Sequence, residues 1–311
     1  MDTRHLVDPE VWPIVGLLPV LEFDADTLAA TREGFASFAP PVEPPIAADV
    51  RTTRRADGSE IELYVFDPAP GAQGRAALCH IHGGGMILGS ARDQQLGPSS
   101  MAAALGIPVV SVEYRLAPEA KWPAAPDDAE AAARWVAANG AMLGRSATSL
   151  ILTGDSAGGT LTLLTALALR NKPAAAPVAL MIPLYPMADG SKSYPSSRQF
   201  ADGYGLSSAD SAYYDHAYAP DKSSPRHSAL LADLAGLPPT VLVAAGLDPL
   251  RDGDRAFAGK LASAGVPVSY YEVPGMIHGF ATYRRGIASA QGELEHIMGL
   301  ARAMLAKAPV K

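Results

Sequence analysis

A serine flanked by two glycines constrains the fold of this chain more than any other feature. The stretch reads Thr-Gly-Asp-Ser-Ala-Gly-Gly at residues 153–159, between an apolar run at 149–152 and a helix-patterned run at 160–170. It fits the Gly-x-Ser-x-Gly turn, in which a strand turns sharply into a helix and holds the serine in a strained conformation with its Oγ exposed. Gly154 and Gly158 stand where a Cβ would collide with neighbouring backbone. Taken alone, the same five residues also fit an ordinary glycine-rich turn.

Strand-like and helix-like patterns alternate on both sides of this turn. We expect strands at 75–81, 108–112, 149–152, 178–182, 240–245 and 268–273, and helices at 123–138, 254–264 and 287–305. An antiparallel hairpin is predicted before them, at 50–54 and 61–66, around a turn that contains Asp57-Gly58. Continuous apolar strands separated by helices indicate an α/β fold with a mostly parallel sheet, covered by helices on both faces.

Composition narrows the class of protein. At 311 residues the chain is long enough for one large α/β domain, or for one core domain with a small appended cap. Hydrophobic residues make up 48% of it and charged residues 18%, which is an ordinary balance for a globular protein. The formal net charge is -7 and Lys and Arg form no cluster longer than a pair, so we expect no nucleic-acid partner. The single cysteine, Cys79, has apolar neighbours and is predicted to be buried.

Neither a signal peptide nor a membrane span is expected. The first residues carry acid and histidine with no apolar run behind them, and no stretch approaches 18 apolar residues. The sequence therefore favours a cytoplasmic location.

Two segments depart from the alternating pattern. Prolines divide residues 1–45 into short amphipathic pieces, including a helix expected within 25–38. Residues 185–229 are rich in Ser and Tyr, and an insertion of this size in a compact α/β unit is typical of a lid or binding element. We expect both segments, 1–45 and 185–229, to form a cap over an α/β core made of 46–184 and 230–311.

Two polar residues follow later strands in the order that the serine requires. Asp248 comes after the strand predicted at 240–245, and His278 follows the strand predicted at 268–273. In α/β hydrolases the acid and then the histidine follow the serine in this order. A serine hydroxyl is a poor nucleophile until an imidazole accepts its proton and a carboxylate fixes the imidazole tautomer. Ser156, His278 and Asp248 are predicted to fill these roles, with Asp252 as a second candidate acid at the start of a helix.

The stretch His82-Gly83-Gly84-Gly85 follows the strand predicted at 75–81 and matches the glycine loop of lipases and esterases. Such a loop offers backbone N–H groups to an oxyanion on the substrate carbonyl. We expect the N–H groups of Gly83, Gly84 and Ala157 to form this oxyanion hole, and His82 to brace the loop by hydrogen bonds.

Five motifs in order give the chain a resemblance to a known family. It resembles the hormone-sensitive-lipase-like family of microbial carboxylesterases in the motifs His82-Gly83-Gly84-Gly85, Tyr114-Arg115-Leu116-Ala117-Pro118-Glu119, Gly154-Asp155-Ser156-Ala157-Gly158-Gly159, Asp248-Pro249-Leu250 and Ile277-His278-Gly279-Phe280. The resemblance implies an α/β hydrolase with a helical cap that hydrolyses small-molecule esters of short to medium acyl chains. It also implies no metal or organic cofactor and the possibility of a homodimer.

The sequence leaves the substrate and some residue roles open. Amide, lactone or thioester cleavage would use the same triad, and a ligand receptor on the same fold would lack the histidine that is present here. Met86, Ile87, Leu88, Tyr204 and Tyr213 are predicted to line the substrate pocket, with core packing as an equal alternative. Arg115 and Glu119 fit either a charged substrate or, preferably, a structural network.

Overall fold

One mixed sheet of eight strands forms the centre of the molecule. The computed structural model describes residues 4–15, 27–37, 43–70, 76–143, 148–284 and 286–307. The strand order is β1-β2-β4-β3-β5-β6-β7-β8. The strands are β1 (Asp49–Arg54), β2 (Glu60–Phe66), β3 (Ala76–Ile81), β4 (Val109–Val112), β5 (Ser149–Asp155), β6 (Val178–Leu184), β7 (Thr240–Leu247) and β8 (Val268–Ile277).

The pairing of these strands confirms the predicted fold class. β1 pairs antiparallel with β2, and β2 antiparallel with β4, so the expected hairpin lies at one edge of the sheet. From β4 to β8 every pair is parallel. Parallel strands end at the same edge, and this places the segments that follow β3, β5, β7 and β8 at one side of the molecule.

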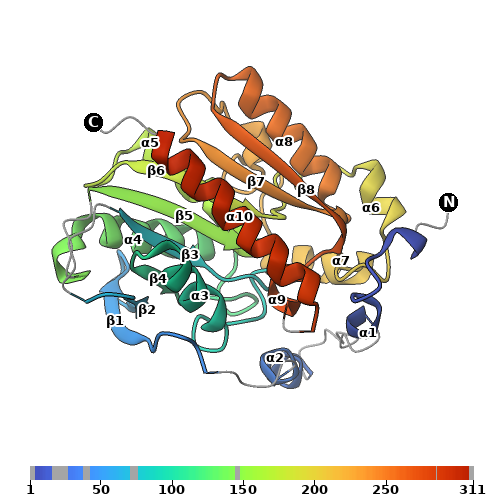
Figure 1. Ribbon diagram of the computed structural model, residues 1–311, viewed down its shortest axis with the longest axis horizontal. Coiled ribbons are helices and arrows are strands. Elements are labelled where there is room, and N and C mark those ends of the chain that lie inside the picture. Colours follow the sequence, from blue (N-terminus) through green and yellow to red (C-terminus); the bar gives the residue numbers. More distant parts are fainter. Residues whose placement is uncertain are drawn as a thin grey trace.

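Helices cover both faces of the sheet (Figure 1). One face carries α4 (Ala124–Ala138), α5 (Ala157–Asn171) and α8 (Arg251–Ser263). The other carries α3 (Leu96–Leu105) and α10 (Ala288–Lys307), with the short α9 (Phe280–Tyr283) beside α10. Alternate residues of β3 pack on opposite faces of the sheet, since Ala77 and Cys79 belong to one apolar cluster and Leu78 to the other. Cys79 is fully buried, as predicted, and burial raises the pKa of its thiol to about 12.

Four strands run further than their apolar patterns predict. β5 continues past Leu152 to Asp155, β6 to Leu184, β7 to Leu247 and β8 to Ile277. In β5 the polar Thr153 is fully buried because its hydroxyl donates a hydrogen bond of 2.7 Å to the carbonyl of Ile182. A paired hydroxyl can lie in the core, so the apolar run underestimates the length of the strand.

The remaining elements lie largely at the edge where the parallel strands end. Figure 1 shows α1 (Trp12–Val15), α6 (Pro195–Gln199) and α7 (Ser208–Tyr218) on that side. The other short elements are η1 (Arg4–Leu6), α2 (Leu28–Ser37), η2 (Gly140–Leu143) and η3 (Ala229–Leu231). Val7, Val11 and Leu28 are buried, so the described parts of the N-terminal segment pack on the core. Residues 1–3, 16–26 and 38–42 of the predicted cap segment 1–45 lie outside the described residues.

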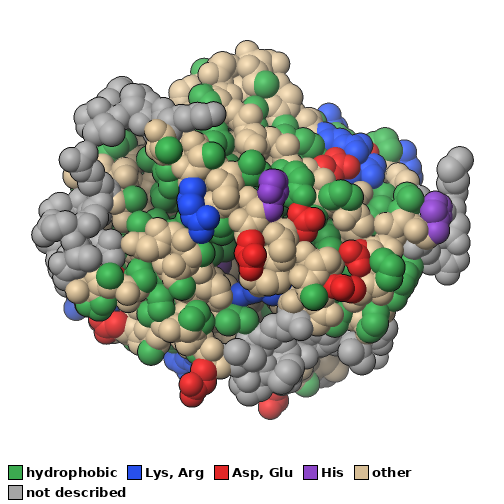
Figure 2. Space-filling model, in the orientation of Figure 1, with side chains coloured by type: hydrophobic (Ala, Val, Ile, Leu, Met, Phe, Trp, Pro, Cys, Tyr) green, Lys and Arg blue, Asp and Glu red, His purple; other side chains and the backbone are tan. Residues whose placement is uncertain are grey.

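Charged side chains of both signs are interspersed over the face shown in Figure 2 rather than gathered into one patch. Among the described residues, no helix combines the length and the hydropathy that crossing a bilayer requires.

Candidate active site

Ser156 lies at the junction of β5 and α5 with a backbone conformation that few residues adopt. Its φ is 54° and its ψ is -117°, and its amide donates a hydrogen bond of 2.9 Å to the carbonyl of Leu184. A Cβ on Gly154 would lie 2.5 Å from the carbonyl oxygen of Ile81, and one on Gly158 would clash with the same oxygen. The two glycines therefore let the turn pack directly against the end of β3, which holds Ser156 in its strained conformation.

The structure brings together Ser156, His278 and Asp248. The Oγ of Ser156 lies 2.7 Å from Nε2 of His278, and Nδ1 of His278 lies 2.7 Å from Oδ2 of Asp248. A carboxylate only accepts hydrogen bonds, so Nδ1 carries the proton and Nε2 is left to accept from the serine hydroxyl. Asp248 is 1% exposed, and its other oxygen accepts a hydrogen bond of 2.8 Å from the amide of Leu250.

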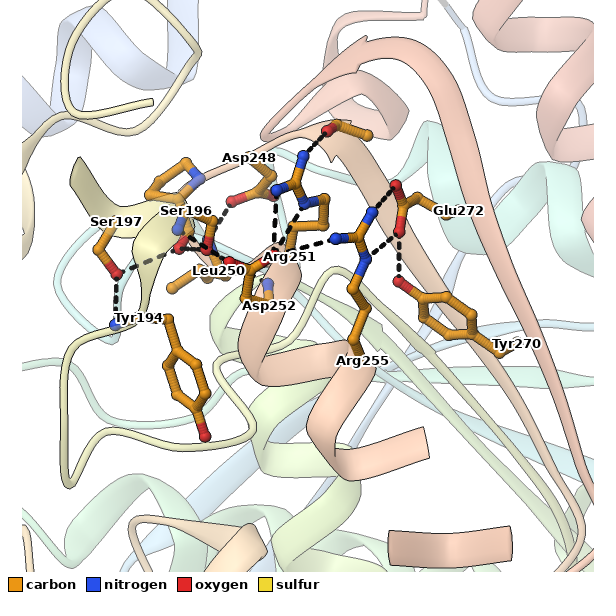
Figure 3. A network of polar contacts seen from close by, with 12 residues as sticks. Tyr194, Ser196, Ser197, Asp248, Leu250, Arg251, Asp252, Arg255, Tyr270 and Glu272 are labelled. Carbon is orange, nitrogen blue, oxygen red and sulfur yellow. Dashed lines mark hydrogen bonds and ion pairs between the residues drawn. The ribbon is translucent and has the colours of Figure 1, made fainter. Parts of the chain in front are cut away.

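Asp252, the second candidate acid, binds other partners than the imidazole (Figure 3). Its carboxylate accepts hydrogen bonds from the amide of Ser196 at 2.9 Å and from Nε of Arg251 at 3.0 Å. Arg255 extends the network to Glu272 with a 2.6 Å ion pair. Of the two carboxylates, Asp248 therefore contacts the imidazole, and Asp252 ties α6 to the start of α8.

The glycine loop after β3 carries backbone N–H groups without a partner. Gly84 and Gly85 have φ values of +118° and +64°, which L residues with side chains rarely adopt. The amides of Gly84, Gly85 and Ala157 donate no hydrogen bond to any residue that the structure describes. Ala157 begins α5, whose first N–H groups have no acceptor within the helix.

Gly83, the first glycine of the loop, lies against the side chain of Asp155. Its backbone amide lowers the pKa of that carboxyl group. A Cβ at Gly83 would lie 2.6 Å from Oδ2 of the same carboxylate, which shows how closely the two approach. The sequence does not distinguish the three consecutive glycines, and this contact is what sets Gly83 apart from Gly84 and Gly85.

His82 braces the loop, as expected. Its Nδ1 lies 2.8 Å from the carbonyl of Gly83, and its ring stacks on Tyr114 at 4.2 Å between centroids. The hydroxyl of Tyr114 donates a hydrogen bond of 3.0 Å to the carbonyl of His82. Burial lowers the pKa of His82 to about 4, so the ring is neutral at pH 7 and serves as a support for the loop.

Arg115 and Glu119 belong to structural networks, which was the preferred interpretation of the sequence. Arg115 binds the buried carboxylate of Asp128 through two of its nitrogens, and Arg55 binds it from another direction. Glu119 pairs with Arg32 of α2 at 2.8 Å. Arg32 also donates to the carbonyls of Ile87 and Ala117, so it connects α2 with the segment after the glycine loop.

Ser156 opens into a cavity of about 580 Å³. The other lining residues include Gly85, Met86 and Ala157, residues 187–194 and parts of α7. A larger cavity of about 1190 Å³ lies between α2, α3 and α10 and does not include Ser156 among its lining residues. Among the described residues, no cluster of three or more His, Cys, Asp or Glu side chains is placed to bind a metal ion.

Only Met86 of the five predicted pocket residues lines the cavity at Ser156. Ile87 and Leu88 are fully buried in the core instead. Tyr204 packs against Phe200, and its backbone carbonyl accepts a hydrogen bond from the amide of His278. Tyr213 packs on the core, and the neighbouring turns of α7 bring Tyr214 and Tyr218 to the cavity instead. The sequence alone does not show which side of the helix faces Ser156, so it does not distinguish one of these tyrosines from another.

Comparison with known proteins gives relatives along the whole chain. A family model described as the alpha/beta hydrolase fold matches residues 78–282. An ethyl acetate hydrolase of Pseudomonas putida is 35% identical and aligns over 76% of each chain. A carboxylesterase of Mycobacterium tuberculosis, NlhH, is 32% identical over 97% of each chain. The structure of an ester hydrolase from the metagenome of Lake Arreo superposes with a TM-score of 0.86 at 32% identity, covering 96% of this chain and 98% of the other.

An α/β sheet that presents a serine, an imidazole and a carboxylate in a hydrogen-bonded row defines the class of serine hydrolases. The matched segment and these relatives show that the chain belongs to the hormone-sensitive-lipase-like family of α/β hydrolases. The relatives named above are enzymes that hydrolyse carboxylic esters.

Proposed function

We propose that the protein is a carboxylesterase in which Ser156 is the nucleophile, His278 the general base and acid, and Asp248 the residue that orients the imidazole. The observation that carries the proposal is the unbroken row of hydrogen bonds, 2.7 Å from serine to histidine and 2.7 Å from histidine to carboxylate. Ser156 lines a cavity, through which a substrate can reach its hydroxyl.

The chemistry follows from this geometry. The Oγ of Ser156 attacks the ester carbonyl carbon as its proton passes to Nε2 of His278, which gives a tetrahedral intermediate. When the intermediate collapses, Nε2–H donates that proton to the departing alcohol oxygen and leaves an acyl group on Ser156. A water then attacks the acyl carbon, His278 accepts its proton, and the proton returns to Oγ as the acid departs.

We assign the oxyanion hole to the N–H groups of Gly84, Gly85 and Ala157. All three lack a partner within the described structure, and Gly85 and Ala157 line the cavity together with Ser156. Loss of one such donor from a comparable hydrolase costs about 2.7–4 kcal/mol of transition-state stabilisation. The hole therefore supplies a large share of the expected rate enhancement.

Short to medium acyl esters are the proposed substrates. One relative is an ethyl acetate hydrolase, and a cavity of about 580 Å³ holds a small ester with room to spare. Hydrolysis of p-nitrophenyl acetate and butyrate tests the proposal, together with Ser156→Ala and His278→Ala. Activity should disappear in both variants while their circular dichroism stays native. Full activity of a folded Ser156→Ala protein would overturn the mechanism.

A cap, a homodimer and a cytoplasmic location are also proposed. Residues 185–229, with the N-terminal segment, form a cap, which is supported by the presence of residues 187–194 and of α7 in the cavity lining. A homodimer, implied by the family, is tested by light scattering on the purified protein. A cytoplasmic location is tested by fractionation of cells that express the full chain.

A further inference from the structure

Two side chains of the cavity wall carry hydrogen-bonding atoms without a partner. Tyr218 ends α7, and His227 lies in the loop that follows; both line the cavity that contains Ser156. Each is only 4% exposed. The hydroxyl of Tyr218 and Nε2 of His227 are buried and make no hydrogen bond within the described part of the chain.

Such an arrangement is unfavourable unless something binds there. Leaving a buried polar atom without a partner costs about 1–3 kcal/mol. The rings of the two residues lie 6.4 Å apart between centroids, so one small group could serve both. Gly190, which also lines the cavity, helps to seat the imidazole, because a Cβ at this position would lie 2.5 Å from Nε2 of His227.

The two carboxylates among the lining residues of this cavity already have partners. The carboxylate of Asp189 accepts hydrogen bonds from the hydroxyls of Tyr194 at 2.8 Å and Ser191 at 2.6 Å. Asp215 forms an ion pair with Lys222. Burial lowers the pKa of His227, so its imidazole is neutral at pH 7. This part of the cavity therefore fits an uncharged polar group better than an ion.

Resting on the carboxylesterase function proposed above, we infer that Tyr218 and His227 form a polar subsite for an uncharged oxygen on the ester half that enters this cavity. The substrate class is then an ester that bears a hydroxyl or keto oxygen besides its scissile bond. Both groups accept a hydrogen bond from a phenol or an imidazole N–H, and a hydroxyl can also donate one.

Matched pairs of esters test this subsite. On the acyl side, ethyl 3-hydroxybutyrate is compared with ethyl butyrate and ethyl 5-oxohexanoate with ethyl hexanoate. On the alcohol side, 2-hydroxyethyl and 4-hydroxybutyl butyrate are compared with propyl and pentyl butyrate. The readout is the ratio of kcat/KM for the polar and the plain member of each pair. The wild type is compared with Tyr218→Phe, His227→Leu and the double variant, and with His216→Leu as a matched control on the exposed side of α7.

The wild type should favour the polar member in at least one series. Each single substitution should then lower that ratio about threefold to tenfold, which is the range of one hydrogen bond. His216→Leu should leave the ratio unchanged. No preference in either series, or a preference that survives in the double variant, would overturn the subsite. Neither result would affect the esterase assignment, which depends on the loss of activity in Ser156→Ala.

Discussion

The hydroxyl of Thr282 donates a hydrogen bond of 3.2 Å to the carboxylate of Asp155, and this contact joins the segment after His278 to the serine turn. The backbone of Gly83 lies against the same carboxylate, since a Cβ there would be 2.6 Å from Oδ2. Asp155 therefore connects the loops that carry Ser156, His278 and the three glycines. Burial raises the pKa of Asp155, and attraction to His278 and the hydrogen bonds oppose that rise. The carboxylate is therefore linked to the imidazole in two ways, by electrostatic attraction and by the hydrogen bond from Thr282 in the segment that follows His278.

Replacing Asp155 with Asn should move the acid limb of the kcat/KM profile to lower pH. The substitution keeps the shape of the side chain but removes a negative charge that stabilises the imidazolium of His278. We expect about a tenfold loss of kcat/KM at the optimum, the scale of one charge-assisted hydrogen bond. Thr282→Val removes the donor and keeps the charge, so it should lower kcat without moving the limb. Identical pH profiles for wild type and Asp155→Asn would show that the carboxylate is only structural.

Replacing Asp248 or Asp252 with Asn should have different effects on kcat and on the melting temperature. Asp248→Asn should lower kcat by about 10⁴, the loss seen when the acid of another triad is changed in this way, because an amide favours the wrong imidazole tautomer. Asp252→Asn should keep kcat within about tenfold and lower the melting temperature, since it weakens contacts with Ser196 and Arg251. Steady-state kinetics and thermal unfolding measured on both variants decide the matter. The reverse pattern would transfer the catalytic role to Asp252.

Two Gly→Ala substitutions in helices should have opposite effects on stability. At Gly158 a Cβ would clash with the carbonyl of Ile81, so Gly158→Ala should destabilise the fold strongly and abolish activity. Gly259 lies within α8, and nothing lies within 4 Å of a Cβ placed there. Gly259→Ala should raise the free energy of unfolding by about 0.5–1 kcal/mol because alanine is the better helix former. Urea titrations measure both changes, and a stable, active Gly158→Ala protein would contradict the tight turn.

Asp254 should make the protein less stable as the pH rises. Both of its carboxylate oxygens are buried without a hydrogen-bond partner in the described structure, and burial next to Asp248 and Glu272 raises its pKa well above the usual range. The unfolded chain loses this proton near pH 4, whereas the folded chain retains it, so stability falls as the pH increases between the two pKa values.

Asp254→Leu, which has a similar branched shape, removes this effect. The stability of the variant relative to wild type should grow by up to about 1.4 kcal/mol per pH unit from pH 4 upward, until the folded-state pKa is reached. Chemical unfolding at pH 4, 6 and 8 provides the test, and the difference between the two proteins cancels the titration of all other groups. A difference that is constant with pH would mean that Asp254 is ionised in the folded state.

Much of the fold could be predicted from the sequence because its signals are local. Apolar runs separated by helical patterns specify a parallel sheet, and the turn Asp57-Gly58 marks the hairpin of β1 and β2. The order of Ser156, Asp248 and His278 along the chain specifies which strand ends carry them. What the patterns underestimate is strand length, since a buried polar residue such as Thr153 pairs its hydroxyl within the core.

Choices between chemically equivalent residues depended on the tertiary structure. Gly83, Gly84 and Gly85 are indistinguishable in sequence, but Gly83 packs against the carboxylate of Asp155, whereas Gly85 lines the cavity that contains Ser156. Tyr213 and Tyr218 carry the same side chain on α7, and only the packing of that helix brings Tyr218 to the cavity. The sequence by itself determined the chemistry, because a nucleophile, a base and an acid are residue types. The three-dimensional arrangement decided which residues of each type take part, because hydrogen bonds reach only about 3 Å and depend on direction.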